Sequence, residues 1–149
     1  MRIVLFEPDI PQNTGTIIRT CACFGLGLEI IEPCGFVFDD KALKRAGMDY
    51  IDYEKIRFHT CFDDFTTTIT DKERLILLTT KASAKLYTFS FTADDILLFG
   101  KESAGVPEYV HNRANARLRI PMKEGYRSLN LAVSVAITTA EALRQTDMF

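Results

Sequence analysis

Residues 96–108 read ILLFGKESAGVPE, in which four apolar residues lead directly into a loop with two glycines, a proline and a charged pair. A short continuous apolar run is typical of a strand buried on both faces of a parallel sheet. Ligands of open parallel sheets bind beyond the carboxyl ends of the strands, where this loop lies. Gly100 indicates a close approach of the backbone, and Glu102 places a carboxylate near the end of the sheet. The segment therefore predicts a parallel α/β fold with a ligand site.

Similar apolar runs recur along the chain and alternate with helical patterns. We expect strands at 3–6, 28–31, 56–59, 75–78, 96–99 and 118–120. We expect a first helix that starts at Asn13 or Thr14 and ends at Gly25. Further helices are expected at 39–47, 62–69, 107–112 and 129–145. Strands that alternate with helices and lack hairpin turns predict a mainly parallel sheet with helices on both faces. At 149 residues, the chain 1–149 is expected to form a single domain.

The composition is that of a globular protein, with 47% hydrophobic and 26% charged residues. Apolar runs stay well short of the roughly 20 residues that a membrane span needs, and the N-terminal run is too short for a signal peptide. We therefore expect a soluble, cytoplasmic protein without a membrane partner. The cysteines should be reduced in that compartment, and neither histidine completes a zinc spacing with them, so no metal is expected. The cysteines are Cys21, Cys23, Cys34 and Cys61.

The net charge of −2 excludes a strongly basic coat for nucleic acid, but the charge is unevenly distributed. Between residues 101 and 127, six basic residues face three acidic ones, which gives this segment a charge of +3. The basic residues are Lys101, Arg113, Arg117, Arg119, Lys123 and Arg127. This asymmetry permits a local phosphate-binding face, and ordinary solvated surface charge is the alternative.

Two further loops carry candidate site residues. Residues 11–19, PQNTGTIIR, open a helix with small polar residues and place Arg19 about a turn and a half inside it, where free N–H groups and a guanidinium can hold a phosphate or a sugar. Residues 120–131, IPMKEGYRSLNL, lead into the last helix, with Ser128 as its expected N-cap and Asn130 in its first turn. Each loop taken alone is also compatible with a plain helix entry.

The loop 96–108 lacks the Gly-Lys-Ser/Thr order of a Walker loop and the Gly-x-Gly-x-x-Gly turn of dinucleotide-binding folds. Together, however, the three loops resemble the motifs of the SPOUT methyltransferases. These motifs are an Asn-x-Gly-x-x-x-Arg helix start, a Phe-Gly-x-Glu-x-x-Gly-Val/Leu-Pro loop and an Ile-Pro-Met…Ser-Leu-Asn segment. The likeness covers nearly the whole chain and is strongest to the minimal members that methylate the ribose of the tRNA wobble nucleotide.

This resemblance implies a C-terminal trefoil knot that forms the site of S-adenosylmethionine, and a homodimer in which two chains share the surface for tRNA. It implies a cofactor site at Leu78, Gly100, Glu102, Ile120, Met122, Ser128 and Leu129. It implies a catalytic set of Arg19, Asn13, Ser128 and Asn130. Ala132-Val133 departs from the pattern, since many members carry serine or asparagine there.

The family implicates Arg19 in removal of the hydroxyl proton. Because a guanidinium is an unsuitable proton acceptor, we expect Arg19 instead to orient phosphate and hydroxyl and to stabilise alkoxide charge. The alternatives are a non-catalytic RNA-binding module, a protein that binds a small nucleotide, and a methyltransferase for another tRNA or rRNA ribose. An RNA-binding module would need only the basic residues, and a nucleotide-binding protein would need only the glycine loops. Neither of these two alternatives predicts all three motifs together.

Overall fold

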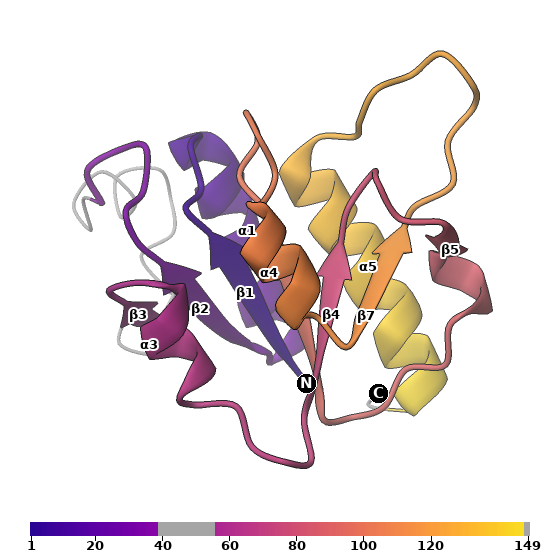
Figure 1. The fold of residues 1–149 in the computed structure, drawn as a ribbon, viewed down its shortest axis with the longest axis horizontal. Coiled ribbons are helices and arrows are strands. Elements are labelled where there is room, and N and C mark those ends of the chain that lie inside the picture. The colour runs from indigo at the N-terminus through magenta and orange to yellow at the C-terminus, as the bar shows by residue number, and fades with distance from the viewer. Residues whose placement is uncertain (39–55, 148–149) are drawn as a thin grey trace.

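The structure is a computed structural model that describes residues 1–38 and 56–147. These residues form a seven-stranded sheet in the order β3-β2-β1-β6-β4-β7-β5, and its strands pair in parallel (Figure 1). The strands are β1 (Arg2–Phe6), β2 (Gly27–Ile31), β3 (Ile56–His59), β4 (Arg74–Leu78), β5 (Ala84–Lys85), β6 (Asp95–Phe99) and β7 (Ala116–Arg119). The predicted fold class is confirmed, whereas the knot stays a prediction.

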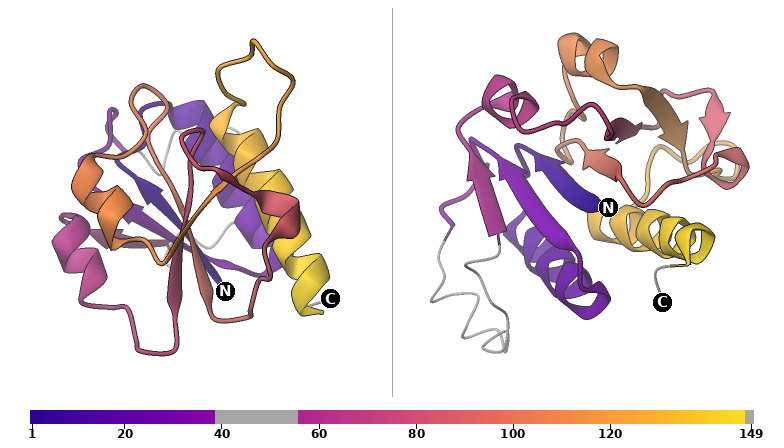
Figure 2. Two further views of the ribbon diagram at one scale, coloured as in Figure 1. Left: turned by 45° about the vertical axis from the view of Figure 1, so that its right-hand side comes forward. Right: turned by 90° about the horizontal axis from the view of Figure 1, so that it is seen from below.

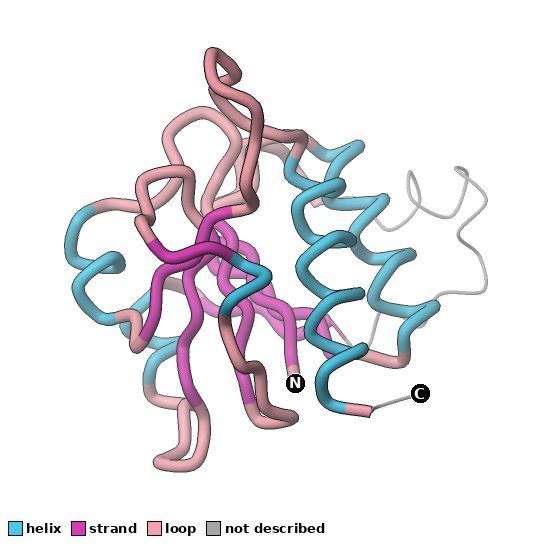
Figure 3. Tube along the Cα trace, turned by 90° about the vertical axis from the view of Figure 1, so that its right-hand side faces the viewer, coloured by secondary structure: helices cyan, strands magenta, loops and turns pink. Residues whose placement is uncertain are grey.

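Helices cover both faces of the sheet, as predicted. They are α1 (Pro11–Phe24), α3 (Phe62–Thr66), α4 (Glu108–Arg113) and α5 (Leu131–Thr146), with a 3-10 turn η2 (Leu86–Thr88). Figure 2, in its right view, shows α1 and α5 on one side of the sheet and α3 and α4 on the other. Figure 3 shows that α1 and α5 run side by side.

Strand alternation produces two separate hydrophobic cores. In β1, Ile3 and Leu5 pack in the core beneath α1 and α5, whereas Val4 and Phe6 pack in the core beneath α3 and α4. Side chains of successive strand residues point to opposite faces, so a strand buried on both sides must be apolar at every position. This requirement explains the continuous apolar runs of the central strands.

Both helices that border the expected site begin at residues other than those predicted. Helix α1 begins at Pro11 after Ile10, so Asn13 and Thr14 lie inside its first turn and neither caps it. Proline suits the first position of a helix because its missing N–H has no partner to lose there. Helix α5 begins at Leu131, and its N-cap is Asn130 instead of Ser128. The prediction of Ser128 as the cap, with Asn130 inside the helix, was therefore wrong.

Other boundaries differ by a few residues. Helix α3 ends at Thr66, three residues before the predicted end, and β7 occupies 116–119 where 118–120 was expected. The short strand β5 was missed because its two residues show no hydrophobic alternation, and the helix expected at 39–47 lies outside the described residues. In the ranges 1–38 and 56–147, no helix is long and apolar enough to cross a membrane.

Candidate functional site

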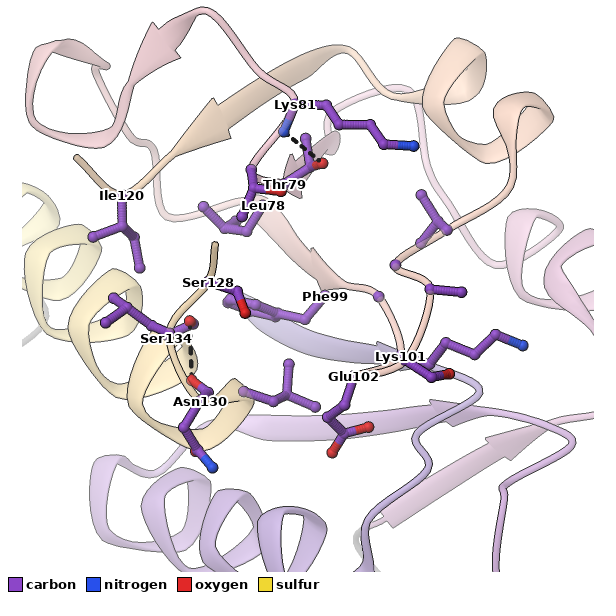
Figure 4. A pocket seen from close by; sticks show the side chains of 18 of the residues that line it. Leu78, Thr79, Lys81, Phe99, Lys101, Glu102, Ile120, Ser128, Asn130 and Ser134 are labelled. Carbon is purple, nitrogen blue, oxygen red and sulfur yellow. Dashed lines mark hydrogen bonds between the residues drawn. The ribbon is translucent and has the colours of Figure 1, made fainter. Parts of the chain in front are cut away.

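A cavity of about 550 Å³ lies at the carboxyl end of the sheet. Its walls are the loops after β4, β6 and β7, together with the starts of α1 and α5 (Figure 4). Parallel strands bring all these loops to one edge, although they are distant in the sequence. The volume is within the range of small-molecule sites.

Nearly all the predicted site residues meet in this cavity. Those that line it are Asn13, Leu78, Gly100, Glu102, Ile120, Met122, Ser128, Leu129 and Asn130. In the described part of the chain, Arg19 instead occupies an exposed position of α1, outside the lining of the cavity. The structure therefore brings together the motif residues of all three loops and leaves Arg19 apart from them.

A relay of side-chain hydrogen bonds joins the three loops. Asn130 donates through Nδ2 to Oδ1 of Asn13 over 2.8 Å, and Asn13 donates through its own Nδ2 to Oε1 of Glu102, also over 2.8 Å. The second oxygen of Glu102 accepts the backbone N–H of Asp9 at 2.8 Å. Asn13 is only 8% exposed. A buried amide needs partners for both its donor and its acceptor, and this arrangement supplies them.

The carboxylate of Glu102 therefore holds the loops together. Asn130 has a second function, because its Oδ1 accepts the N–H groups of Ala132 at 2.9 Å and Val133 at 3.3 Å and so caps α5. The cap and the relay fix the position of the 128–131 segment relative to α1 and to the loop after β6.

Gly100 is required by the shape of its own loop. A Cβ at this position would lie 2.5 Å from the carbonyl carbon and 2.7 Å from the Cα of Gly105. The two arms of the loop are joined by a pair of backbone hydrogen bonds. The N–H of Lys101 donates to the carbonyl of Gly105 at 3.1 Å, and the N–H of Gly105 donates to the carbonyl of Lys101 at 2.8 Å. The close backbone approach that the sequence indicates at Gly100 is thus an approach to Gly105.

Charged side chains tie the same loop to the loop after β1. The ammonium of Lys101 lies 2.7 Å from Oε2 of Glu7, and this hydrogen bond raises the pKa of Lys101. Ser103 donates to Asp9 and thereby lowers the pKa of that carboxyl. Lys101 is consequently engaged within the protein, which removes it from the free basic residues that the sequence suggested.

His111 is a cavity residue that the sequence did not single out for this role. It lies on α4, is 6% exposed and lines the cavity with Thr79 and Lys81. Burial lowers its pKa from the ordinary 6.5, the charges of Lys81 and Arg117 lower it further, and Glu108 opposes them. A lone histidine on a short helix carries no signal in sequence that would place it in a site.

The lining combines apolar walls with a few polar groups. Leu78, Phe99, Val106, Ile120 and Leu129 form the apolar surfaces, and Ser128, Asn130 and Ser134 supply hydroxyl and amide groups. This pattern suits a flat ligand with a polar edge, such as a nucleoside. Across 1–38 and 56–147, no group of three or more His, Cys, Asp or Glu side chains could hold a metal ion.

Comparison with known proteins gives this geometry a context. The SpoU rRNA Methylase family matches residues 1–140. A tRNA (cytidine(34)-2'-O)-methyltransferase of Beijerinckia indica is 51% identical over 144 residues, which are 96% of this chain and 90% of that protein. A solved structure described as giving structural insights into the 2-OH methylation of C/U34 on tRNA is 42% identical, with a TM-score of 0.90, over 97% of this chain and 94% of the other. An AdoMet-bound rRNA methyltransferase from Sinorhizobium meliloti is 28% identical, with a TM-score of 0.82, over 96% of this chain and 55% of that one.

Proposed function

This chain belongs to the SpoU rRNA methylase family, and we propose that it is an S-adenosylmethionine-dependent methyltransferase for the ribose 2′-hydroxyl of the tRNA wobble nucleotide, cytidine or uridine. The observation that carries the proposal is the cavity in which the three family motifs meet and are joined by the Asn130–Asn13–Glu102 relay. The relative from Beijerinckia indica shares half of its residues with this chain over nearly the full length of both.

The residues that line the cavity fit S-adenosylmethionine. Leu78, Ile120 and Leu129 offer apolar surfaces for an adenine. We infer that Gly100 and Met122 complete the adenosine site and that Ser128 binds the ribose, while Glu102 acts through the position of Asn13. Bound S-adenosylmethionine supplies an electrophilic methyl group on a sulfonium.

The remaining task of the protein is to align the ribose hydroxyl and to manage its proton. Asn13 and Asn130 lie at the border between the cavity and α1, where they hold the frame for an incoming ribose. Arg19 is the cation of the catalytic set, and we assign it the orientation of a phosphate and the stabilisation of charge on the ribose oxygen. The single domain 1–149 would then carry the cofactor and the contacts to RNA.

We further infer that two copies form the active enzyme. Three large apolar side chains lie exposed around the starts of α1 and α5, with Ile10 at 41%, Leu129 at 38% and Val133 at 46% exposure. Ile10 and Leu129 also line the cavity, so a second copy that covers these residues would border the site. Such a dimer would bring exposed residues of α1, Arg19 among them, close to a partner.

The test of the function is methyl transfer to a defined RNA. We expect the protein to transfer labelled methyl from S-adenosylmethionine to an anticodon stem-loop, and nuclease digestion with mass spectrometry should map the methyl to the ribose at position 34. The matched control is the same stem-loop with 2′-deoxyribose at position 34, which lacks the acceptor oxygen and should stay unlabelled. Equal labelling of both RNAs, or a methyl on another nucleotide, would contradict the assignment. RNA binding without transfer would indicate a non-catalytic module.

A further inference from the structure

One edge of the sheet presents a row of arginine and lysine side chains. In β7, Arg117 and Arg119 flank the buried Leu118, so both lie on the face of the sheet opposite α5. Lys85 of β5 pairs with Arg119 in the register and therefore shares that face. Helix α4 lies over the middle of the sheet on this side and leaves β7 uncovered (Figure 1).

Within the described part of the chain, these cations have no counterion. Among residues 1–38 and 56–147, the ion pairs of arginine and lysine involve Arg2, Arg74, Lys101 and Arg144. Within the same ranges, Lys85, Arg117 and Arg119 form none. Unpaired like charges on one face repel each other, and a bound polyanion relieves this electrostatic repulsion. Of the basic residues that the sequence suggested, Lys101 is paired with Glu7 and Arg113 lies on α4, whereas Arg117, Arg119, Lys123 and Arg127 lie on this edge and in the loop that follows β7.

The row of cations leads into a second, smaller cavity of about 180 Å³ under that loop. Arg119, Lys123 and Arg127 line it with a single carboxylate, Glu124, and with Tyr126, which is 72% exposed. An exposed aromatic ring among cations is a typical platform for an unstacked base. The loop that carries these residues extends beyond the end of the sheet (Figure 1).

The second cavity adjoins the first. Thr80, Ile120, Met122 and Arg127 line both of them. On the other side of the larger cavity, the charges of Lys81 and Arg117 reach His111 in its wall. The cationic edge is therefore adjacent to the site where the ribose must be presented.

We propose that this cationic edge, which consists of Lys85, Arg117, Arg119, Lys123 and Arg127, binds the phosphate backbone of the tRNA anticodon arm, and that Tyr126 stacks on a base of its loop. The inference rests on the proposed function, because it uses tRNA as the polyanion. Phosphate contacts carry no sequence information, but they fix the register of an RNA on a protein and so place one ribose at the cavity. The charge that binds the RNA is thus separate from the groups that bind the cofactor.

The experiment compares two matched double variants. Arg117→Gln/Arg119→Gln removes two exposed charges of the edge, and neither residue lines the larger cavity. Arg57→Gln/Lys72→Gln removes two exposed charges elsewhere, from β3 at the opposite edge of the sheet and from the turn before β4. Fluorescence anisotropy with a labelled anticodon stem-loop, without cofactor and at several salt concentrations, gives the affinity and its salt dependence.

We expect the edge variant to lose about 20-fold in RNA affinity near 0.15 M salt, and the slope of log Kd against log salt to fall by roughly 1.4 to 1.8. The control variant should match the wild type. KM for the stem-loop should rise in the edge variant, whereas kcat at saturating RNA and the calorimetric affinity for S-adenosylmethionine should be unchanged. The inference would be overturned if the edge variant kept the wild-type affinity and slope. It would also be overturned if the edge variant lost the dimer in sedimentation, because this face would then serve contacts between copies. Absence of methyl transfer by the wild type would instead refute the proposed function, and the binding measurement separates the two failures.

Discussion

The side chain of Asn130 donates a hydrogen bond of 2.8 Å to that of Asn13, although 117 positions separate the two residues in the chain. Through this bond the start of α5 is attached to the first turn of α1, and through Asn13 to Glu102 in the loop after β6. The three motifs are thus linked to one another by side-chain hydrogen bonds. The integrity of the relay should therefore control the shape of the cavity.

Substitution of Asn130 tests the relay and the cap together. Asn130→Ala removes the acceptor for the N–H groups of Ala132 and Val133, and we expect the free energy of unfolding to fall by about 1–2 kcal/mol in urea denaturation. Cofactor affinity should also fall, by roughly tenfold, since the lost hydrogen bond leaves Oδ1 of the buried Asn13 without a donor.

Asn130→Asp separates the two effects. Its carboxylate still accepts the N–H groups at the start of α5 but has no hydrogen to donate to Asn13. We expect nearly wild-type stability together with reduced cofactor affinity in calorimetry. Unchanged affinity in a stable Asn130→Asp protein would show that the relay does not shape the cavity.

Gly100→Ala should open the loop after β6. The added Cβ would meet the backbone of Gly105 at 2.5–2.8 Å, and backbone cannot move aside as a flexible side chain can. We expect a loss of about 1–3 kcal/mol in stability and at least a tenfold loss in cofactor affinity. Gly27→Ala is the control, because its Cβ would come no closer than 4.0 Å to the Cβ of Arg2. If both variants bind the cofactor like the wild type, the tight loop is dispensable for the site.

His111 should make the stability of the protein depend on pH. Burial lowers its pKa below the ordinary 6.5, so in mildly acidic solution the unfolded chain binds a proton that the folded protein does not. Its contribution to stability is complete above pH 6.5 and is lost as the pH falls from there through the pKa of the folded state. Chemical denaturation at pH 7.5 and at lower pH should show this decline.

The matched variant is His111→Asn, which keeps a polar side chain at the same place but does not titrate. We expect its stability to change less than that of the wild type over the same pH interval. The pKa itself can be followed by NMR of the imidazole. An imidazole that titrates at or above 6.5, or a pH dependence that persists in His111→Asn, would contradict this assignment.

The sequence predicted the sheet well because burial on both faces forces strands such as β1 and β6 to be apolar throughout. The positions of caps were harder to predict. Ser128 and Asn130 are both good N-cap residues, and in the structure Asn130 caps α5 while it also donates a hydrogen bond to Asn13, a distant residue that local sequence does not reveal. Asn13 lies inside α1 because the helix begins earlier, at Pro11, and its side chain is held there between Asn130 and Glu102.

The sequence predicted which loops form the site, but it did not predict which side chains pair with one another there. Lys101 resembles its basic neighbours in the sequence, yet it pairs with Glu7 from the other end of the chain. Lys85 belongs to the cationic edge through the parallel pairing of β5 with β7, which no local pattern indicates. In both cases, the pairing of distant segments determines whether a charge is free to meet a ligand.

Arg19 poses the sharpest question, because it belongs to a family motif and yet lies outside the cavity of its own chain. We expect Arg19→Ala, and also Arg19→Lys with its different geometry, to lose on the order of 10² to 10³ in single-turnover methylation, as is typical when a group that stabilises transition-state charge is removed. Cofactor affinity should be nearly unchanged in both variants. Near-wild-type turnover in both would remove Arg19 from the catalytic set.

Mixed dimers then show which cavity Arg19 serves. If it completes the cavity of a partner, Arg19→Ala subunits supply intact cavities and Gly100→Ala subunits supply the arginine. At a cofactor concentration that leaves both variants strongly impaired, dissociation and reassociation of the two proteins then restores one working site in each mixed dimer. Random pairing makes half of the dimers mixed, and half of their sites are intact, so about a quarter of the wild-type activity should return. If Arg19 serves its own chain, every site in the mixture still carries a defect and no activity returns. The recovered fraction, measured with sedimentation as the check that mixed dimers formed, therefore distinguishes a shared site from a self-contained one.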